Sequence, residues 1–241
     1  MRIKTIFFTL TAIITLAFFT VEAAAQNKFE HKKVDFDMIQ YETLNNSSPY
    51  YYQKLVKSFN SNDTIMNFEA YRYLYYGFLF QEDYNPFRSN EFEGKSEVEK
   101  LYYEQNLTRD DCNKIENYAV QALNDNMFDI DQITYYIYAL KQKKKFARAA
   151  VRQHRLEKLI EAIMSSGYGT KEDPWVVIFP EHEYTLINFL GYVAVDHQEL
   201  PGGIDYIKAY HENDKRKTKD FYFDVSRMLK EAARKFPEDF E

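Results

Sequence analysis

The sequence has almost no cysteine, and this shortage removes two common ways of stabilising a fold. Cys112 is the single cysteine among 241 residues, so no intramolecular disulfide can form. Structural zinc sites built on several thiolates are excluded for the same reason. We therefore expect stability to come from side-chain packing, to which 21 tyrosines and 20 phenylalanines contribute large rings.

The chain also lacks the motifs of several enzyme classes. No GxSxG elbow, GxGxxG fingerprint or GxxxxGK[ST] phosphate loop occurs. His182 and Glu183 begin an HExxH-like pattern, but Leu186 stands where the second histidine would be, which excludes a zinc-protease helix. Residues 165–170 follow a predicted helix rather than a strand, so a helix end and turn is favoured over a phosphate loop. No cofactor and no metal is predicted.

An excess of basic residues is missing as well. The chain has 37 acidic and 31 basic residues, and its net charge is −6. This balance argues against a nucleic acid or an anionic membrane as the main partner. The lysine run from Lys141 to Lys145 is interpreted as a solvated helix end whose cations complement the helix dipole.

Residues 1–25 have the pattern of an export signal. Arg2 and Lys4 precede an apolar run from Ile6 to Phe19, and small residues at positions 23–25 offer a cleavage site. The run is shorter than the ~20 residues of a membrane helix. No cysteine follows the cleavage site to carry a lipid. We expect an exported protein, periplasmic or secreted, that is soluble after cleavage and has no membrane span in the mature chain.

Helix start signals are clearest between residues 47 and 85. Ser48 is predicted to cap a helix that begins at Pro49. Asn67 is predicted to cap the next helix, with Glu69 in its first turn. Apolar residues recur at helical spacing in both segments, namely at Tyr51, Leu55, Phe59, Phe68, Tyr71, Leu74, Tyr75 and Phe78.

More helices are predicted up to Gly167, and strands after it. Thr108 starts one helix, and another spans about 146–166. Strands are predicted at 175–179, 183–196, 204–210 and 221–225, with a bulge or bend at Gly191, a turn at 201–203 and a polar loop at 211–219. A short helix over 228–236 ends the chain. The expected class is α+β: helical hairpins of tetratricopeptide-like geometry (26–167), then a small antiparallel sheet and a C-terminal helix (168–241), packed as one unit.

Several segments match a known family. They are SPYYYQKL, NDT, EAYRYLYYGF and FQEDYNPF, and later SGYGTKEDPWVVI, HEYTLINFLGY and FYFDVSRM. They resemble the secreted family known as domain of unknown function 4919, from Gram-negative gut bacteria. Asn67 and Ala70 stand where the family tends to have threonine and glutamate, so the reciprocal capping box is lost. The resemblance implies no catalytic residues, because the family has no assigned activity.

Two function hypotheses remain open. The favoured one is a non-catalytic envelope protein that binds a protein, a peptide or a glycan. The alternative is a hydrolase in which His182 and His197 meet across a hairpin, with Glu183 or Asp196 to orient them. Hydrogen-bonded histidines at strand edges explain the same residues without catalysis.

Tyrosines are the candidate binding residues, because they combine a large contact area with a polar tip. The candidates are Tyr50, Tyr51, Tyr75, Tyr76, Trp175 and Tyr184. Ordinary core packing produces the same stripes. Thr64, within Asp63-Thr64-Ile65, is a candidate acceptor for an O-linked glycan, although a simple turn or a position before the helix cap is the favoured interpretation.

Overall fold

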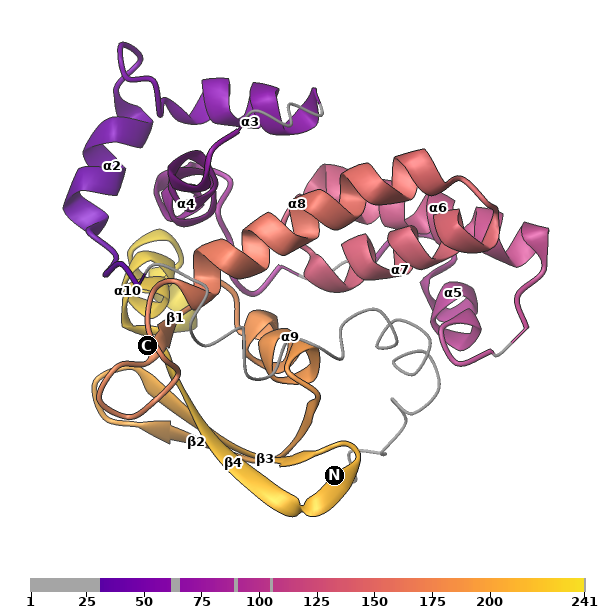
Figure 1. Ribbon diagram of the computed structural model, residues 1–241. Coiled ribbons are helices and arrows are strands. Elements are labelled where there is room, and N and C mark those ends of the chain that lie inside the picture. The colour runs from indigo at the N-terminus through magenta and orange to yellow at the C-terminus, as the bar shows by residue number, and fades with distance from the viewer. Residues whose placement is uncertain (1–30, 62–65, 89–90, 105, 241) are drawn as a thin grey trace. The chain divides into compact units, whose positions relative to one another are not determined.

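The computed structural model describes residues 31–61, 66–88, 91–104 and 106–240, and these form two compact units (Figure 1). Within the described ranges, the first unit spans 91–156, and the second combines 31–88 with 157–240. The predicted export signal and Thr64 lie outside the described residues. No helix in the described part is long and apolar enough to cross a membrane.

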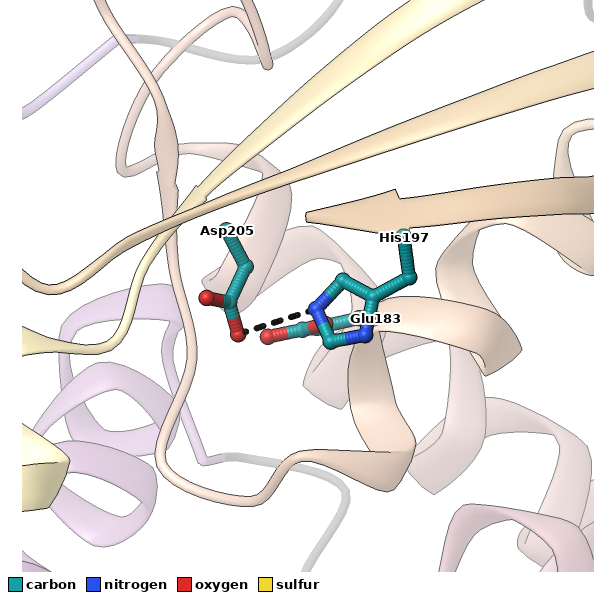
Figure 2. Close-up of side chains that lie close together, drawn as sticks. All are labelled: Glu183, His197 and Asp205. Atoms are coloured by element: carbon teal, nitrogen blue, oxygen red, sulfur yellow. Dashed lines mark ion pairs between the residues drawn. The ribbon is translucent and has the colours of Figure 1, made fainter. Parts of the chain in front are cut away.

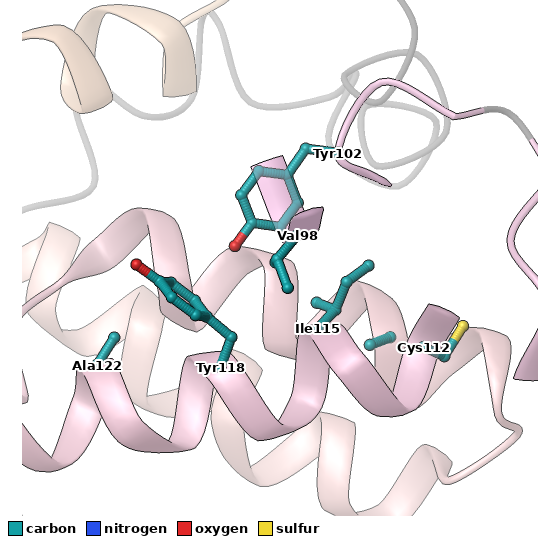
Figure 3. Packing of buried hydrophobic residues seen from close by; sticks show 7 residues of the cluster. Val98, Tyr102, Cys112, Ile115, Tyr118 and Ala122 are labelled. Carbon is teal, nitrogen blue, oxygen red and sulfur yellow. The ribbon is translucent and has the colours of Figure 1, made fainter. Parts of the chain in front are cut away.

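The first unit is helical. Its elements are α5 (Lys95–Leu101), α6 (Arg109–Asp125), α7 (Ile130–Gln142) and the first part of α8 (Phe146–Met164). Helices α5, α6 and α7 share one buried cluster (Figure 3), formed by Val98, Tyr102, Cys112, Ile115, Tyr118, Ala122 and Ala139. Helix α6 begins as predicted, because Thr108 and Asp111 each accept a hydrogen bond from the other's backbone N–H. The single thiol is therefore a core group.

The lysine run at the end of α7 is not simply a solvated helix end, which corrects the interpretation above. Lys143 Nζ lies 2.6 Å from Glu116 Oε2, and the Lys143 side chain is only 6% exposed. Lys145 and Arg148 also pair with Glu116, at 3.4 and 2.8 Å. The run alone could not reveal this cluster, because the carboxylate lies on α6.

Lys144 closes helix α7 in a left-handed conformation that usually belongs to glycine. Its φ is 57°, its N–H bonds the carbonyl of Lys141, and the next N–H bonds that of Leu140. This pair of bonds is the Schellman pattern. Because a side chain in this conformation costs roughly 1 kcal/mol, Lys144→Gly should raise the free energy of unfolding by about that amount. Urea denaturation measures it; an unchanged or lower stability would contradict the assignment.

The second unit combines helices with a sheet, which confirms the α+β class. Its helices are α2 (Phe36–Leu44), α3 (Tyr52–Asn60), α4 (Phe68–Gly77), the last part of α8, α9 (Glu181–Phe189) and α10 (Ser226–Lys235), with short 3₁₀ turns η1 (Phe78–Phe80) and η2 (Pro237–Asp239). Its strands are β1 (Trp175–Val176), β2 (Tyr192–Leu200), β3 (Ile204–His211) and β4 (Asp214–Asp224). The helix predicted over 228–236 is α10.

The sheet has the order β1-β4-β3-β2 and is mixed. Strands β2, β3 and β4 form the predicted antiparallel meander. β1 instead pairs in parallel with β4, which corrects the expectation of a purely antiparallel sheet. The Trp175 ring packs against Phe221 and Phe223 of β4, and this aromatic contact stabilises the pairing of the two-residue strand with β4.

Two local predictions on either side of β2 are wrong. Residues 183–196 do not form one strand, because helix α9 comes first and Gly191 separates it from β2 with a φ of 79°. Apolar residues on both faces cannot distinguish a short buried helix from a strand. The loop predicted at 211–219 is mostly strand, since β4 begins at Asp214 and its exposed half is polar.

Of the two helix caps predicted for α3 and α4, one is confirmed and the other is wrong. Asn67 caps α4 as predicted, because its side chain accepts the N–H of Ala70. Ser48 does not cap α3, which begins only at Tyr52. Its hydroxyl accepts the N–H of Tyr50 and donates to Glu42. A serine that bonds the backbone two residues ahead forms a local turn, and this turn takes the place of the cap.

Buried tyrosines of the second unit bond the backbone of β1 and of the segment that follows it. The Tyr76 and Tyr84 hydroxyls donate to the carbonyls of Val176 and Ile178, at 3.2 and 2.7 Å. The Tyr75 hydroxyl accepts the N–H of Ile178 at 3.2 Å. Buried backbone groups need such partners once the strand pairing ends. The bonds of the Tyr75 and Tyr76 hydroxyls explain why tyrosine occupies core positions of α4.

Candidate functional site

Helix α9 places one carboxyl group in the interior of the second unit. Glu183 is 1% exposed and shares the buried side of α9 with Leu186 and Ile187, three and four residues later. Helix α9 packs against β2 (Figure 1). A carboxyl group on this side of the helix therefore faces the hairpin that follows it in the chain.

The β2–β3 hairpin brings a histidine and an aspartate together. His197 is directly opposite Ile207, and Asp205 lies two residues before Ile207 on the same strand. The alternation of side chains therefore puts His197 and Asp205 on the same face, as a diagonal pair. The His197 Nε2 and Asp205 Oδ2 atoms are 3.5 Å apart.

These three side chains converge on one point. Figure 2 shows Glu183, His197 and Asp205 directed toward one another from α9, β2 and β3. One potential ligand atom from each lies within 4.8 Å of the others. The side chains of His197 and Asp205 are 35% and 13% exposed, so the cluster is closed at the glutamate and open to solvent at the histidine.

The electrostatics of the cluster follow from its burial. Burial raises the pKa of Glu183 to about 9, and the charge of Asp205 and a hydrogen bond with it act in the same direction. Glu183 is therefore protonated at neutral pH and can donate to Asp205. Two neighbouring carboxyl groups in a poorly solvated site share one negative charge for the same reason.

Tyr184 lies at the rim of this cluster. Its ring meets that of His197 edge to face, with centroids 6.1 Å apart, and 39% of the residue is exposed. Burial raises its pKa, with further contributions from the charges of Glu183 and Asp205. The cluster thus combines a carboxylic acid, a carboxylate, an imidazole and a phenol, which are groups that can bind a cation or transfer protons.

Two other residues of the hydrolase hypothesis lie elsewhere. His182 is fully buried, its Nδ1 is 2.7 Å from the Tyr75 hydroxyl, and its ring packs on Phe179. Adjacent helix residues project about 100° apart, so His182 and Glu183 face different neighbours. Asp196 is exposed on β2 and accepts a hydrogen bond from Gln198.

Asp205 was not among the residues predicted from the sequence, although the hairpin contained a signal for it. Gly202 and Gly203 have φ values of 90° and 74°, and they mark the tight turn. A register centred on that turn would have predicted His197 and Asp205 on one face. Glu183 could not be placed in this way, because its segment was predicted to be a strand.

The candidate binding residues divide between core and surface. Tyr75, Tyr76 and Trp175 are at most 3% exposed, so they pack in the interior and offer no surface to a ligand. Tyr50 and Tyr51 are partly exposed. Exposed apolar residues that the sequence analysis did not single out occur on α2, at Met38, Tyr41 and Leu44.

Comparisons with known proteins identify a family. A search of curated proteins and a search of solved structures returned no significant match. The profile of the family described as Domain of unknown function (DUF4919) matches residues 37–234, a range that covers most of the chain and includes the whole cluster. The chain therefore belongs to the DUF4919 family.

Proposed function

We propose that this chain is an exported, non-catalytic interaction module that binds a segment of a partner protein through helix α2. The observation that carries the proposal is an exposed apolar row, here called the α2 surface. Its residues Met38, Tyr41 and Leu44 are 48%, 65% and 52% exposed. Their spacing puts them on one side of the helix, opposite the buried Ile39 and Thr43. Single exposed apolar residues are ordinary, whereas a continuous row is typical of an interaction site.

The surroundings of the α2 surface favour a partner with both apolar and basic side chains. The Tyr50 and Tyr73 rings stack with centroids 4.2 Å apart. Burial raises the pKa of Tyr73, and the charges of Glu42 and Asp35 raise it further, so the acidic flank of α2 adjoins this aromatic pair. The net charge of −6 acts in the same direction. Basic partner residues would pair with these carboxylates and stack on the rings.

A protein segment fits this surface better than a glycan. Burying a sugar hydroxyl without a hydrogen-bond partner costs free energy. The Met38 and Leu44 side chains offer no such partners, whereas they suit leucine-like or aromatic side chains of an extended or helical peptide. Export is supported by the basic and apolar pattern of residues 1–25.

A hydrolase remains the second candidate, because Glu183 and His197 converge with Asp205. It differs from the first proposal in the residues on which it depends. The α2 surface should be dispensable for hydrolysis, and the cluster should be dispensable for partner binding. Glu183→Gln therefore separates the two candidates in a single comparison.

The test is quantitative affinity capture from the native cell envelope. The double variant Met38→Ser/Tyr41→Ser should recover the partner at least about tenfold less well than the unmodified chain. Val120→Ser, which changes an exposed apolar residue of α6, and Glu183→Gln should both leave recovery unchanged. Thermal melts verify that every variant is folded. Equal recovery by the double variant and the Val120 control would refute the proposal.

A further inference from the structure

We infer that Glu183, His197 and Asp205 form a binding site for one divalent transition-metal ion, with Zn²⁺ as the best match. The inference does not rest on the proposed function, because the α2 surface contributes nothing to this site. It rests on the spacing of three donor atoms and on a buried oxygen atom that has no hydrogen-bond partner in the described part of the chain.

The donor spacing suits a small ion. Bonds of about 2.0–2.1 Å to nitrogen and oxygen place neighbouring ligands of a tetrahedral zinc roughly 3.3 Å apart. His197 Nε2 and Asp205 Oδ2 are already 3.5 Å apart. The ligand atoms of all three residues lie within 4.8 Å of one another, so a modest side-chain rotation completes the set.

The second observation concerns Glu183 itself. Its Oε1 atom is fully buried and has no hydrogen-bond partner among the described residues, while the residue is 1% exposed. A buried carboxyl oxygen without a partner is costly, and native proteins rarely tolerate one without a reason. A cation held between Glu183 and the hairpin would satisfy this oxygen.

The composition of the site selects the kind of ion. One imidazole and two carboxyl groups, which bind a metal ion in their deprotonated form, suit Zn²⁺ or a neighbouring first-row ion. Ca²⁺ instead takes six to eight oxygen ligands, and Mg²⁺ prefers an octahedron of oxygens. Three protein ligands leave one coordination position for water or a substrate. The partly exposed His197 side chain lies on the solvent side of the cluster and gives the ion a route of entry.

The test is calorimetric titration of the full chain with ZnCl₂ after treatment with EDTA. We expect one ion per chain with a dissociation constant below roughly 10 μM, and little heat from MgCl₂ or CaCl₂. Zn²⁺ should also raise the melting temperature of the protein. Glu183→Gln, His197→Ala and Asp205→Asn should each weaken binding at least about tenfold.

Asp196→Asn is the matched control, because this exposed carboxylate lies next to His197 on β2 but outside the cluster. It should leave the affinity for Zn²⁺ unchanged. Absence of one-to-one binding in the unmodified chain would overturn the inference. Zinc binding that survives all three ligand substitutions would also overturn it, because the ion would then be adventitious. Circular dichroism confirms the fold of each variant.

Discussion

Glu183→Gln is expected to make the metal-free protein more stable at pH 8, by up to about 5 kcal/mol. The residue is 1% exposed, and its pKa is raised from 4.5 to about 9, first by burial and then by Asp205. The carboxylates of Glu181 and Glu199 also raise it. Glutamine has nearly the same shape, can donate to Asp205 as the protonated acid does, and needs no proton.

The sign follows from the protons that each state binds. Between pH 4.5 and about 9 the folded chain holds a proton on Glu183 that the unfolded chain has released. This contribution to stability is complete below pH 4.5 and is lost as the pH rises, by about 1.4 kcal/mol per pH unit. Glutamine removes this slope, so its advantage over glutamate grows with pH.

Urea denaturation at several pH values from 5 to 8, in the presence of EDTA, measures this effect. The Glu183→Gln profile should diverge from that of the unmodified chain as the pH rises. Asp196→Asn, a change at an exposed carboxylate, should run parallel to the unmodified chain. If the Glu183→Gln profile were also parallel, or if the variant were less stable at pH 8, then Glu183 would not be protonated in the folded protein.

Glu116→Gln should destabilise the protein by roughly 3 kcal/mol. Burial raises the pKa of Glu116, but hydrogen bonds and charges from Lys143 and Arg148 outweigh it and hold the pKa down to about 2. The substitution removes the carboxylate and leaves the Lys143 ammonium group, with 6% side-chain exposure, without its main counter-charge. A buried charge without a partner is among the costliest of single-residue defects.

A surface ion pair of the same unit provides the control for Glu116. Glu97 pairs with Lys114 at 2.8 Å, but their side chains are 60% and 39% exposed, so Glu97→Gln should change the stability by less than about 1 kcal/mol. The Glu116 contribution should be present above pH 4.5 and should disappear as the pH falls toward 2. Equal losses for the two variants in urea denaturation would contradict the buried cluster.

The features that the sequence predicted are those set by residues close together in the chain. Asn67 and Thr108 cap helices through bonds to N–H groups three residues away. The β2–β3 hairpin follows from glycines that mark its turn. Ser48 shows the limit of such local signals, because its hydroxyl bonded a nearer N–H and the side chain of Glu42 instead.

The features that the sequence did not predict depend on partners distant in the chain. Lys143 was predicted to be solvated, because its partner Glu116 lies on another helix and is distant in the sequence. The sequence pattern at Tyr75 and Tyr76 is compatible with either a binding surface or a core. They lie in the core, where their hydroxyls hydrogen-bond the backbone of residues 176–178. The candidate site needed α9, β2 and β3 together, and the misassigned strand at 183–196 concealed its glutamate.

Cross-linking from helix α2 in the native cell shows whether this helix binds a partner. A photo-reactive amino acid at position 41 should give one predominant adduct with an exported protein, identified by mass spectrometry. The same residue at position 120 on α6 should not give this adduct. Indistinguishable products from both positions, or no adduct at position 41, would mean that α2 is not where a partner binds.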